Sequence, residues 1–249
     1  MLVVRRFWKN NKGFIIGLFL LLFFRSAIAD WYHVPSGSMQ PNVLIGDRVW
    51  VNKLAFDVKI PFSDINLYRH QEPKTGDVIV FDSVKAGERL IKRVIATSGD
   101  KVAMIDNHLY INGMPVSVGP IETEQPFDRF LHDRDIAYYF EERHETEGHE
   151  AENAHGLNLE DNPAVSFPIR ISRQTFAHRS SFKEVTIPPD HYWVMGDNRD
   201  NSADSRVIGL VPRNELIGRA ERILISLDGD NYYLPRPGRL WYSLQGEST

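Results

Sequence analysis

Residues 108–116 read His108-Leu-Tyr-Ile-Asn-Gly-Met-Pro-Val116, and this stretch carries the clearest signal of the fold. Two β-rich runs flank Asn112-Gly113. This dipeptide suits a type I′ turn, because both central residues of that turn need a positive φ. The stretch therefore predicts a β-hairpin.

Similar short runs, rich in β-forming residues and bounded by turn residues, continue on both sides of this hairpin. They cover residues 48–53, 77–82, 89–95, 101–105, 192–195, 207–211 and 216–227. Long stretches of helical period are missing outside the amino end. We therefore predict a mostly β chain with a body of antiparallel sheets.

Composition narrows the function classes. The 249 residues include no cysteine, which excludes disulfide frameworks, thiolate metal sites and a cysteine nucleophile. The formal charge of -4 argues against a nucleic-acid partner. The length fits one or two domains.

Acidic residues concentrate in one segment. Residues 120–162 hold thirteen of the 33 acids and three arginines, and the rest of the chain carries a net charge of +6. We interpret this as part of an inserted, charged, β-rich segment at about 119–183. The 120–162 stretch also holds His132, His144, His149 and His155. The spacing from His144 to His149 is one residue too long for a zincin motif, so a solvated loop or β-ribbon is preferred over a metal site.

The amino end is apolar. Residues 13–24 read GFIIGLFLLLFF, with basic residues before the run and Arg25 after it. A spanning helix needs about 20 mostly apolar residues. The run therefore predicts a transmembrane anchor over 13–31 if Arg25 reaches the far headgroups, with Trp31 at that interface. The basic residues place 1–12 in the cytoplasm and 32–249 outside. The alternative is a secretory signal cleaved after Ala29.

A first candidate for chemistry is Pro35-Ser-Gly-Ser-Met-Gln-Pro41, just beyond this segment. Pro, Ser and Gly favour a simple turn. However, Gly37 also allows close backbone approach to a ligand, and the hydroxyl groups of Ser36 and Ser38 flank it.

A second candidate is Leu90-Ile-Lys-Arg-Val-Ile95. Strand alternation places Leu90, Lys92 and Val94 on one face. A lysine buried between apolar neighbours has a lowered pKa, and its neutral amine can act as a general base. The alternative is that Lys92 extends into solvent from an edge strand.

A third candidate is the polar loop Gly196-Asp-Asn-Arg-Asp-Asn-Ser-Ala-Asp-Ser-Arg206. So many charged and amide groups between two apolar strands are costly to order unless they bond to one another. The loop therefore predicts an ion-pair scaffold, and a serine in it can position a base. A calcium loop is less consistent with Arg199 and Arg206.

Together these three pieces resemble the type I signal peptidase family, membrane-bound serine proteases with a Ser/Lys dyad. The resemblance extends from the amino end to about Arg222. It implies that Ser38 is the nucleophile, that Lys92 is the general base, and that an acyl-enzyme forms. Ser36 and the backbone N–H of Ser38 would form the oxyanion hole.

The resemblance also implies supporting roles. Ser202 would orient the Lys92 amine, Asp204 and Arg206 would brace the loop that holds Ser202, and Arg93 would be structural. It implies no cofactor and no metal. The implied partners are preproteins with signal peptides and the lipid bilayer of the cell (inner) membrane, with the catalytic domain on the periplasmic side.

Several alternatives remain at this point. A Ser-His-Asp triad would use His33 or His191 with Ser38. The matches Ser180-Ser-Phe-Lys183 and Lys74-Thr-Gly76 to penicillin-binding signatures are in reversed order and are interpreted as accidental. A specialised protease for a conjugation or pilus substrate and a non-catalytic exported β-rich binding module are the other functions considered.

Overall fold

The computed structural model describes residues 2–63, 65–121, 130–131, 136–144, 164–172, 181–245 and 247–248. Its strands pair antiparallel, and the largest sheet has nine of them. The order in that sheet is β1 (Ala29–His33), β2 (Asp47–Asn52), β16 (Leu216–Asp228), β5 (Val78–Ser83), β6 (Glu88–Ala96), β14 (His191–Met195) and β15 (Val211–Pro212), with β17 (Leu234–Pro235) and β18 (Tyr242–Ser243) paired to β16.

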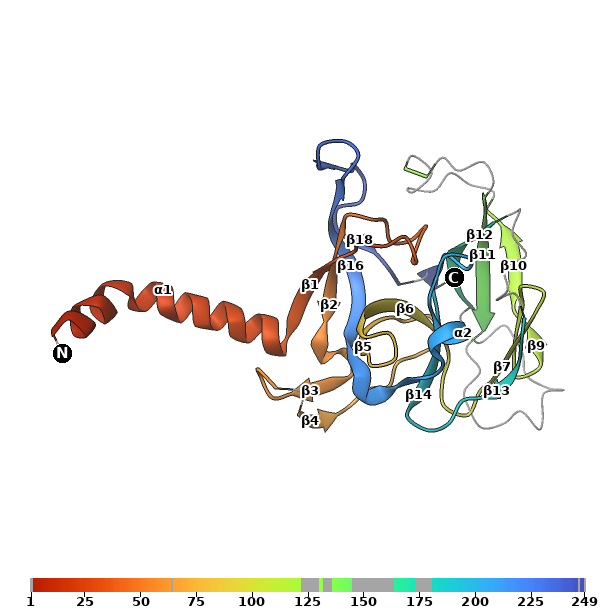
Figure 1. Ribbon diagram of the computed structural model, residues 1–249, viewed down its shortest axis with the longest axis horizontal. Helices are drawn as coiled ribbons and strands as arrows, with labels where there is room; N and C mark the ends of the chain where they lie inside the picture. The colour runs from red at the N-terminus through yellow and green to blue at the C-terminus, as the bar shows by residue number, and fades with distance from the viewer. Residues whose placement is uncertain are drawn as a thin grey trace.

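Three smaller sheets complete the described strands (Figure 1). The first comprises β10 (Ser117–Pro120), β11 (Ile136–His144), β12 (Ala164–Ser172) and β19 (Glu247–Ser248). The second comprises β13 (Phe182–Thr186), β7 (Lys101–Ile105), β8 (His108–Ile111) and β9 (Met114–Pro115). The third pairs β3 (Asp57–Lys59) with β4 (Asn66–Arg69). Short 3-10 helices cover Lys53–Ala55 and Arg213–Glu215.

The prediction of a mostly β chain with antiparallel sheets is confirmed. The predicted hairpin forms between β8 and β9, with φ of 53° at Asn112 and 78° at Gly113. These positive values are the ones a type I′ turn requires. Local turn chemistry therefore decides this part of the fold.

The predicted strand over 207–211 is wrong. The chain forms the short helix α2 (Ser205–Ile208) there, and β15 begins only at Val211. The Asp204 side chain accepts from the backbone N–H of Arg206 and caps the helix, and Gly209 ends it with a φ of 75°. Asp204 and Gly209 are typical of helix ends, and this local signal outweighs the apolar run.

The predicted membrane segment over 13–31 does not form one helix. Helix α1 (Leu2–Ala27) ends first, and residues 29–33 pair with β2. Arg25 binds Asp30 at 2.7 Å and lies 4.4 Å from the centre of the Trp31 ring, so its guanidinium faces the β-body. Within the described residues, no helix combines the length and the mean hydropathy that a bilayer span requires.

Figure 1 shows α1 projecting from the β-body as a single rod, with its amino end far from the sheets. Its other end is attached to the body, because Lys53 Nζ donates to the carbonyl oxygen of Arg25 at 2.8 Å. The Phe24 ring also packs near Trp50 of β2, with 6.2 Å between their centroids. The helix is therefore fixed to the large sheet only at its carboxyl end.

The inserted segment is β-rich where the structure describes it, since β11 and β12 pair over nine residues each. Most of residues 122–163 lie outside the described residues. So do His132, His149 and His155 and the side chain of His144. Among the described residues no group of three or more His, Cys, Asp or Glu side chains gathers as a metal site.

Candidate active site

Ser38 lies in the connection between β1 and β2. Backbone hydrogen bonds close this connection, from Val34 N to Asp47 O and from Gly46 N to Val34 O, both at 3.0 Å. The side chain of Met39 is fully buried in the core beneath the large sheet. The position of Ser38 is therefore set by a buried neighbour and by hydrogen bonds on both sides of the loop.

Lys92 comes from β6 and lies against this loop. Lys92 is 2% exposed, and it begins a run of β6, Lys92–Ala96, in which both faces of the strand are buried. Lys92 Nζ lies 2.9 Å from Ser38 Oγ and donates to the carbonyl oxygen of Ile91 at 2.8 Å. The structure thus brings together the two residues that the sequence proposed as nucleophile and base.

Burial controls the ionisation of Lys92. Loss of water around the amine lowers the pKa of Lys92 from 10.5 to about 8, against the opposing charges of Asp204, Asp197 and Glu88. Removing a charged amine from water favours the neutral form, and here this loss of hydration outweighs the attraction of the three carboxylates. A neutral amine beside a hydroxyl group can accept its proton. Activation of a serine nucleophile requires an arrangement of this kind.

Gly196 separates Ser38 from Ser202. A Cβ added to Gly196 would lie 2.3 Å from Ser202 Oγ and 2.4 Å from the carbonyl oxygen of Ser38. Both distances are far below van der Waals contact, so only glycine fits between these two residues. Ser202 is 3% exposed and therefore lies in the same buried region as Ser38. Its orientation of the Lys92 amine stays a prediction.

Asp204 joins the two ends of the 196–206 loop. It accepts from Gly196 N at 3.0 Å and pairs with Arg206 through two contacts at 2.8 Å. Burial raises the pKa of Asp204, but Arg206, the Gly196 N–H and the hydroxyl of Ser202 outweigh it and leave that pKa below its usual value. The carboxylate stays ionised, and the predicted ion-pair scaffold is present.

Arg93 forms a second ion pair beneath the loop. Both Arg93 and Asp197 are fully buried, and they are joined by two hydrogen bonds of 2.9 and 2.8 Å. Asn42 Nδ2 donates to the same carboxylate at 2.6 Å. The guanidinium also lies 4.1 Å from the centre of the Phe167 ring of β12. The bidentate ion pair and these neighbouring contacts hold Asp197, and with it the start of the 196–206 loop, in a fixed position.

Two contacts from the inserted segment were missed from the sequence. Glu141 of β11 forms a buried ion pair with Arg199 of the loop. Arg170 of β12 donates a hydrogen bond from Nη1 to Gln40 Oε1, two residues after Ser38. Opposite charge was the only signal for the Glu141–Arg199 pair, and nothing in the sequence indicated the Arg170–Gln40 bond, because the partners lie far apart along the chain.

Ser36, the other residue proposed for the oxyanion hole, lies beside Ser38. Their hydroxyl oxygens are 3.5 Å apart, and Ser36 is exposed while Ser38 is 8% exposed. The hydroxyl group of Ser36 is therefore accessible to a ligand that reaches Ser38. Its role stays a prediction.

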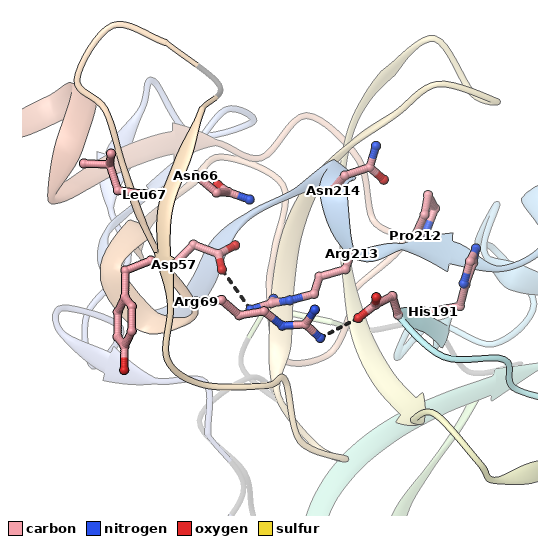
Figure 2. Close-up of a pocket in the computed structure, with 10 residues that line it drawn as sticks. Asp57, Asn66, Leu67, Arg69, His191, Pro212, Arg213 and Asn214 are labelled. Atoms are coloured by element: carbon pink, nitrogen blue, oxygen red, sulfur yellow. Dashed lines mark hydrogen bonds and ion pairs between the residues drawn. The ribbon is translucent and has the colours of Figure 1, made fainter.

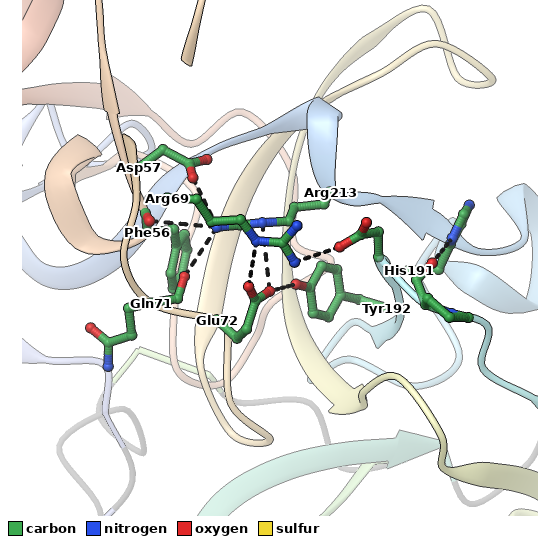
Figure 3. Close-up of polar contacts among 10 residues, drawn as sticks. Phe56, Asp57, Arg69, Gln71, Glu72, His191, Tyr192 and Arg213 are labelled. Carbon is green, nitrogen blue, oxygen red and sulfur yellow. Dashed lines mark hydrogen bonds and ion pairs between the residues drawn. The ribbon is translucent and has the colours of Figure 1, made fainter. Parts of the chain in front are cut away.

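A cavity of about 550 Å³ lies elsewhere, beside β4 and β15 (Figure 2). The ten residues that line it include neither Ser38 nor Lys92. Its charged groups are paired with one another or with the neighbouring Glu72. Arg213 donates to Asp57 at 2.8 Å, and Arg69 pairs with both Glu72 and Asp190. Figure 3 shows Arg213 beside Asp57 and Arg69 beside Glu72. We interpret this network as a structural support for the β3–β4 hairpin.

The two histidines considered as alternative bases can also be located in the structure. His191 lines this cavity (Figure 2). Its Nδ1 lies 2.8 Å from the carbonyl oxygen of Pro189. His33 is exposed at the end of β1. In the part of the chain that the structure describes, neither histidine is hydrogen-bonded to Ser38, so the geometry favours Lys92.

Comparisons with known proteins identify the family of the chain. The family described as signal peptidase, peptidase S26 matches residues 8–225. Signal peptidase I of Pseudomonas fluorescens is 32% identical over 88% of this chain and 72% of its own length. Signal peptidase I of Aquifex aeolicus is 31% identical over 83% of this chain and 81% of its own length. A crystal structure of a signal peptidase I from Enterococcus faecalis V583 is 26% identical and has a TM-score of 0.32; the match covers 60% of this chain and 97% of that one.

Proposed function

The chain belongs to the signal peptidase (peptidase S26) family and is a serine peptidase, and from this premise we propose that it removes signal peptides from exported preproteins with Ser38 as nucleophile and Lys92 as general base. The observation that carries the assignment of residues is the 2.9 Å separation of Lys92 Nζ and Ser38 Oγ at a buried site. The substrate class comes from the relatives named above.

The reaction begins with proton transfer. Neutral Lys92 Nζ takes the proton of Ser38 Oγ as that oxygen attacks the scissile carbonyl carbon. The carbonyl oxygen becomes an oxyanion, which accepts hydrogen bonds from the Ser38 N–H and the Ser36 hydroxyl. Pre-aimed donors of this kind contribute roughly 10²–10³-fold in rate.

The tetrahedral intermediate then collapses. The C–N bond breaks, the protonated Lys92 amine gives its proton to the departing amine, and an ester remains on Ser38. A water molecule, deprotonated by the neutral Lys92, attacks this ester. The second collapse releases the signal peptide as a carboxylic acid and returns the proton to Ser38 Oγ.

Cleavage of a preprotein with an Ala-x-Ala site tests this assignment. We expect the wild-type chain in detergent to cleave it, Ser38→Ala to be inactive, and Lys92→Ala to lose at least about 10³-fold in rate. Lys183→Ala, a change at an exposed lysine, should cleave like the wild type. Cleavage that persists in both Ser38→Ala and Lys92→Ala would contradict the dyad, and absence of cleavage by the wild type would contradict the substrate class.

We also propose that α1 binds a lipid bilayer, in the orientation that its basic residues predict, with the β-body on the outer side. Eight large apolar side chains from Phe14 to Phe23 are 38% to 73% exposed, and only Ile15 among the large apolar residues of this run is partly buried. Patches of this kind on a protein surface mark interaction sites. Arg25 at the end of the run is held by Asp30, so the helix is presented from the body at a fixed attachment point.

Flotation with vesicles of phosphatidylethanolamine and phosphatidylglycerol tests this binding. We expect the wild type to float with the vesicles and the double variant Phe19→Glu, Leu22→Glu to stay in the dense fraction, because two buried carboxylates oppose insertion. Val84→Glu, a change at a residue that is 81% exposed on the β-body, is the matched control and should float. Equal flotation of the double variant would exclude α1 as the attachment.

A further inference from the structure

Asn198 holds two successive carbonyl groups beside the nucleophile. Its side-chain Nδ2 donates to the carbonyl oxygen of Gly37 at 3.0 Å, and its backbone N–H donates to the carbonyl oxygen of Ser38 at 3.1 Å. Asn198 is 5% exposed, so water competes little for these bonds. One residue of the 196–206 loop therefore controls the backbone on both sides of Ser38.

This contact sets the direction of the Ser38 N–H. The peptide bond between Gly37 and Ser38 is trans, since the structure has a cis bond only at Gln40–Pro41 among the described residues. In a planar trans peptide the C=O and the following N–H point in opposite directions. A Gly37 carbonyl that points at Asn198 therefore turns the Ser38 N–H away from Asn198.

The Ser38 N–H is available for a ligand. Within the part of the chain that the structure describes, it donates to no acceptor, whereas the Gly37 carbonyl accepts from both Asn198 and the Gln40 N–H at 3.2 Å. A nearly buried backbone donor usually has a partner. A flip of this peptide would replace the free donor with a carbonyl oxygen, which would repel a developing oxyanion.

Asn198 is itself held firmly. Its neighbour Asp197 is fixed by Arg93, and the Asp197 carbonyl accepts from Arg170 N at 2.9 Å. Arg199 N in turn donates to the carbonyl oxygen of Arg170 at 3.0 Å. The contact to Gly37 is thus made from a segment that is bonded on both sides, and it can resist rotation of the peptide.

We infer that Asn198 is a positioning residue for the oxyanion hole: its side-chain amide holds the Gly37–Ser38 peptide so that the Ser38 N–H faces the oxyanion that forms during attack. The inference rests on the proposed function, because it assigns the aim of a group in that reaction. Asn198 acts through the backbone and does not touch the reacting atoms.

The variant Asn198→Asp tests this role with little change in size. A carboxylate accepts but does not donate, so it loses the bond to Gly37 and repels that carbonyl oxygen. We expect kcat for the preprotein to fall roughly 10- to 100-fold with KM within about 2-fold, since one oxyanion donor is typically worth 10²–10³-fold. In Asn198→Ala, which adds no charge near the amine, the midpoint of the pH–rate profile, which follows Lys92, should not move. Asn198→Ala should show the same split with a smaller loss.

Two further measurements separate positioning from a general structural role. A peptide boronate, which forms a tetrahedral adduct on a serine, should lose affinity for Asn198→Asp by the same factor as kcat/KM. A non-cleavable peptide of the same sequence should bind as it does to the wild type. Asn201→Ala, an exposed asparagine in the same loop, is the matched control and should retain wild-type kcat and boronate affinity.

Three outcomes would each overturn the inference. The first is a wild-type kcat in Asn198→Asp, and the second is an equal loss of affinity for the boronate and the peptide. The third is failure of both Asn198 variants to fold. The parallel Ser38→Ala assay keeps this result distinct from the proposed function. Cleavage by Ser38→Ala would contradict the proposed function. Loss of cleavage in Ser38→Ala with full activity in both Asn198 variants would contradict only the positioning role.

Discussion

Lys92→Met is expected to abolish cleavage and at the same time to raise the free energy of unfolding at pH 6.5 by about 3 kcal/mol. The wild-type amine is 2% exposed, and burial lowers its pKa from 10.5 to about 8. Each pKa unit corresponds to about 1.4 kcal/mol, so holding the charged amine in the folded protein is costly. Methionine has similar length and no charge to bury.

The sign of the pH dependence follows from these two values. Below pH 8 the amine is protonated in both states, and the folded wild type bears the whole cost of burying the charge. Between pH 8 and about 10.5 the Lys92 amine is neutral in the folded protein but still protonated in the unfolded chain. The unfolded state therefore binds more protons, and the stability of the wild type increases as pH rises. Cleavage by the wild type should also increase as pH passes through about 8, because the neutral amine is the base.

Urea unfolding of wild type and variant at pH 6.5 and pH 10.5 measures this effect. The difference in free energy of unfolding between the two proteins should decrease from about 3 kcal/mol at pH 6.5 towards zero at pH 10.5. Lys183→Met, at an exposed lysine, controls for removal of a charge and should show a difference near zero at both pH values. A less stable Lys92→Met at pH 6.5, or a difference independent of pH, would contradict the buried amine as the cause.

Gly196→Ala is expected to reduce kcat by more than about 100-fold. The new Cβ would meet Ser202 Oγ at 2.3 Å and the carbonyl oxygen of Ser38 at 2.4 Å, and one of them is backbone. Relief of this clash must move the nucleophile loop, the Ser202 loop, or both. Misplacement by about 1 Å is enough for a loss of this size.

Cleavage assays measure the loss of activity caused by this clash, and thermal unfolding measures the loss of stability. Overpacking should also lower the free energy of unfolding by about 1–3 kcal/mol. Gly119→Ala is the matched control, because a Cβ at Gly119 meets nothing within 4 Å and its φ is not positive, so both properties should stay at the wild-type level. Wild-type kcat in Gly196→Ala would show that the two loops are not tightly packed against each other.

Much of the fold follows from local sequence. Strands such as β2, β5 and β7 were predicted to within a residue or two, because alternation and turn residues act over short distances. The short helix at Ser205–Ile208 was missed because its cap at Asp204 was interpreted only as a charge. The end of α1 was not predicted because tertiary contacts determine it: residues 29–33 pair with β2, and Asp30 binds Arg25.

The sequence by itself determined which chemical groups are present: a serine hydroxyl, a lysine on an apolar strand face and a polar loop with paired charges. Tertiary structure alone decided what these groups can do. It placed Lys92 Nζ against Ser38 Oγ across 54 positions of sequence, and it set their burial. It also brought Glu141 and Arg170 from the inserted segment to Arg199 and Gln40. The reason is physical: a pKa and the aim of an N–H depend on water and on neighbours that come from distant parts of the chain.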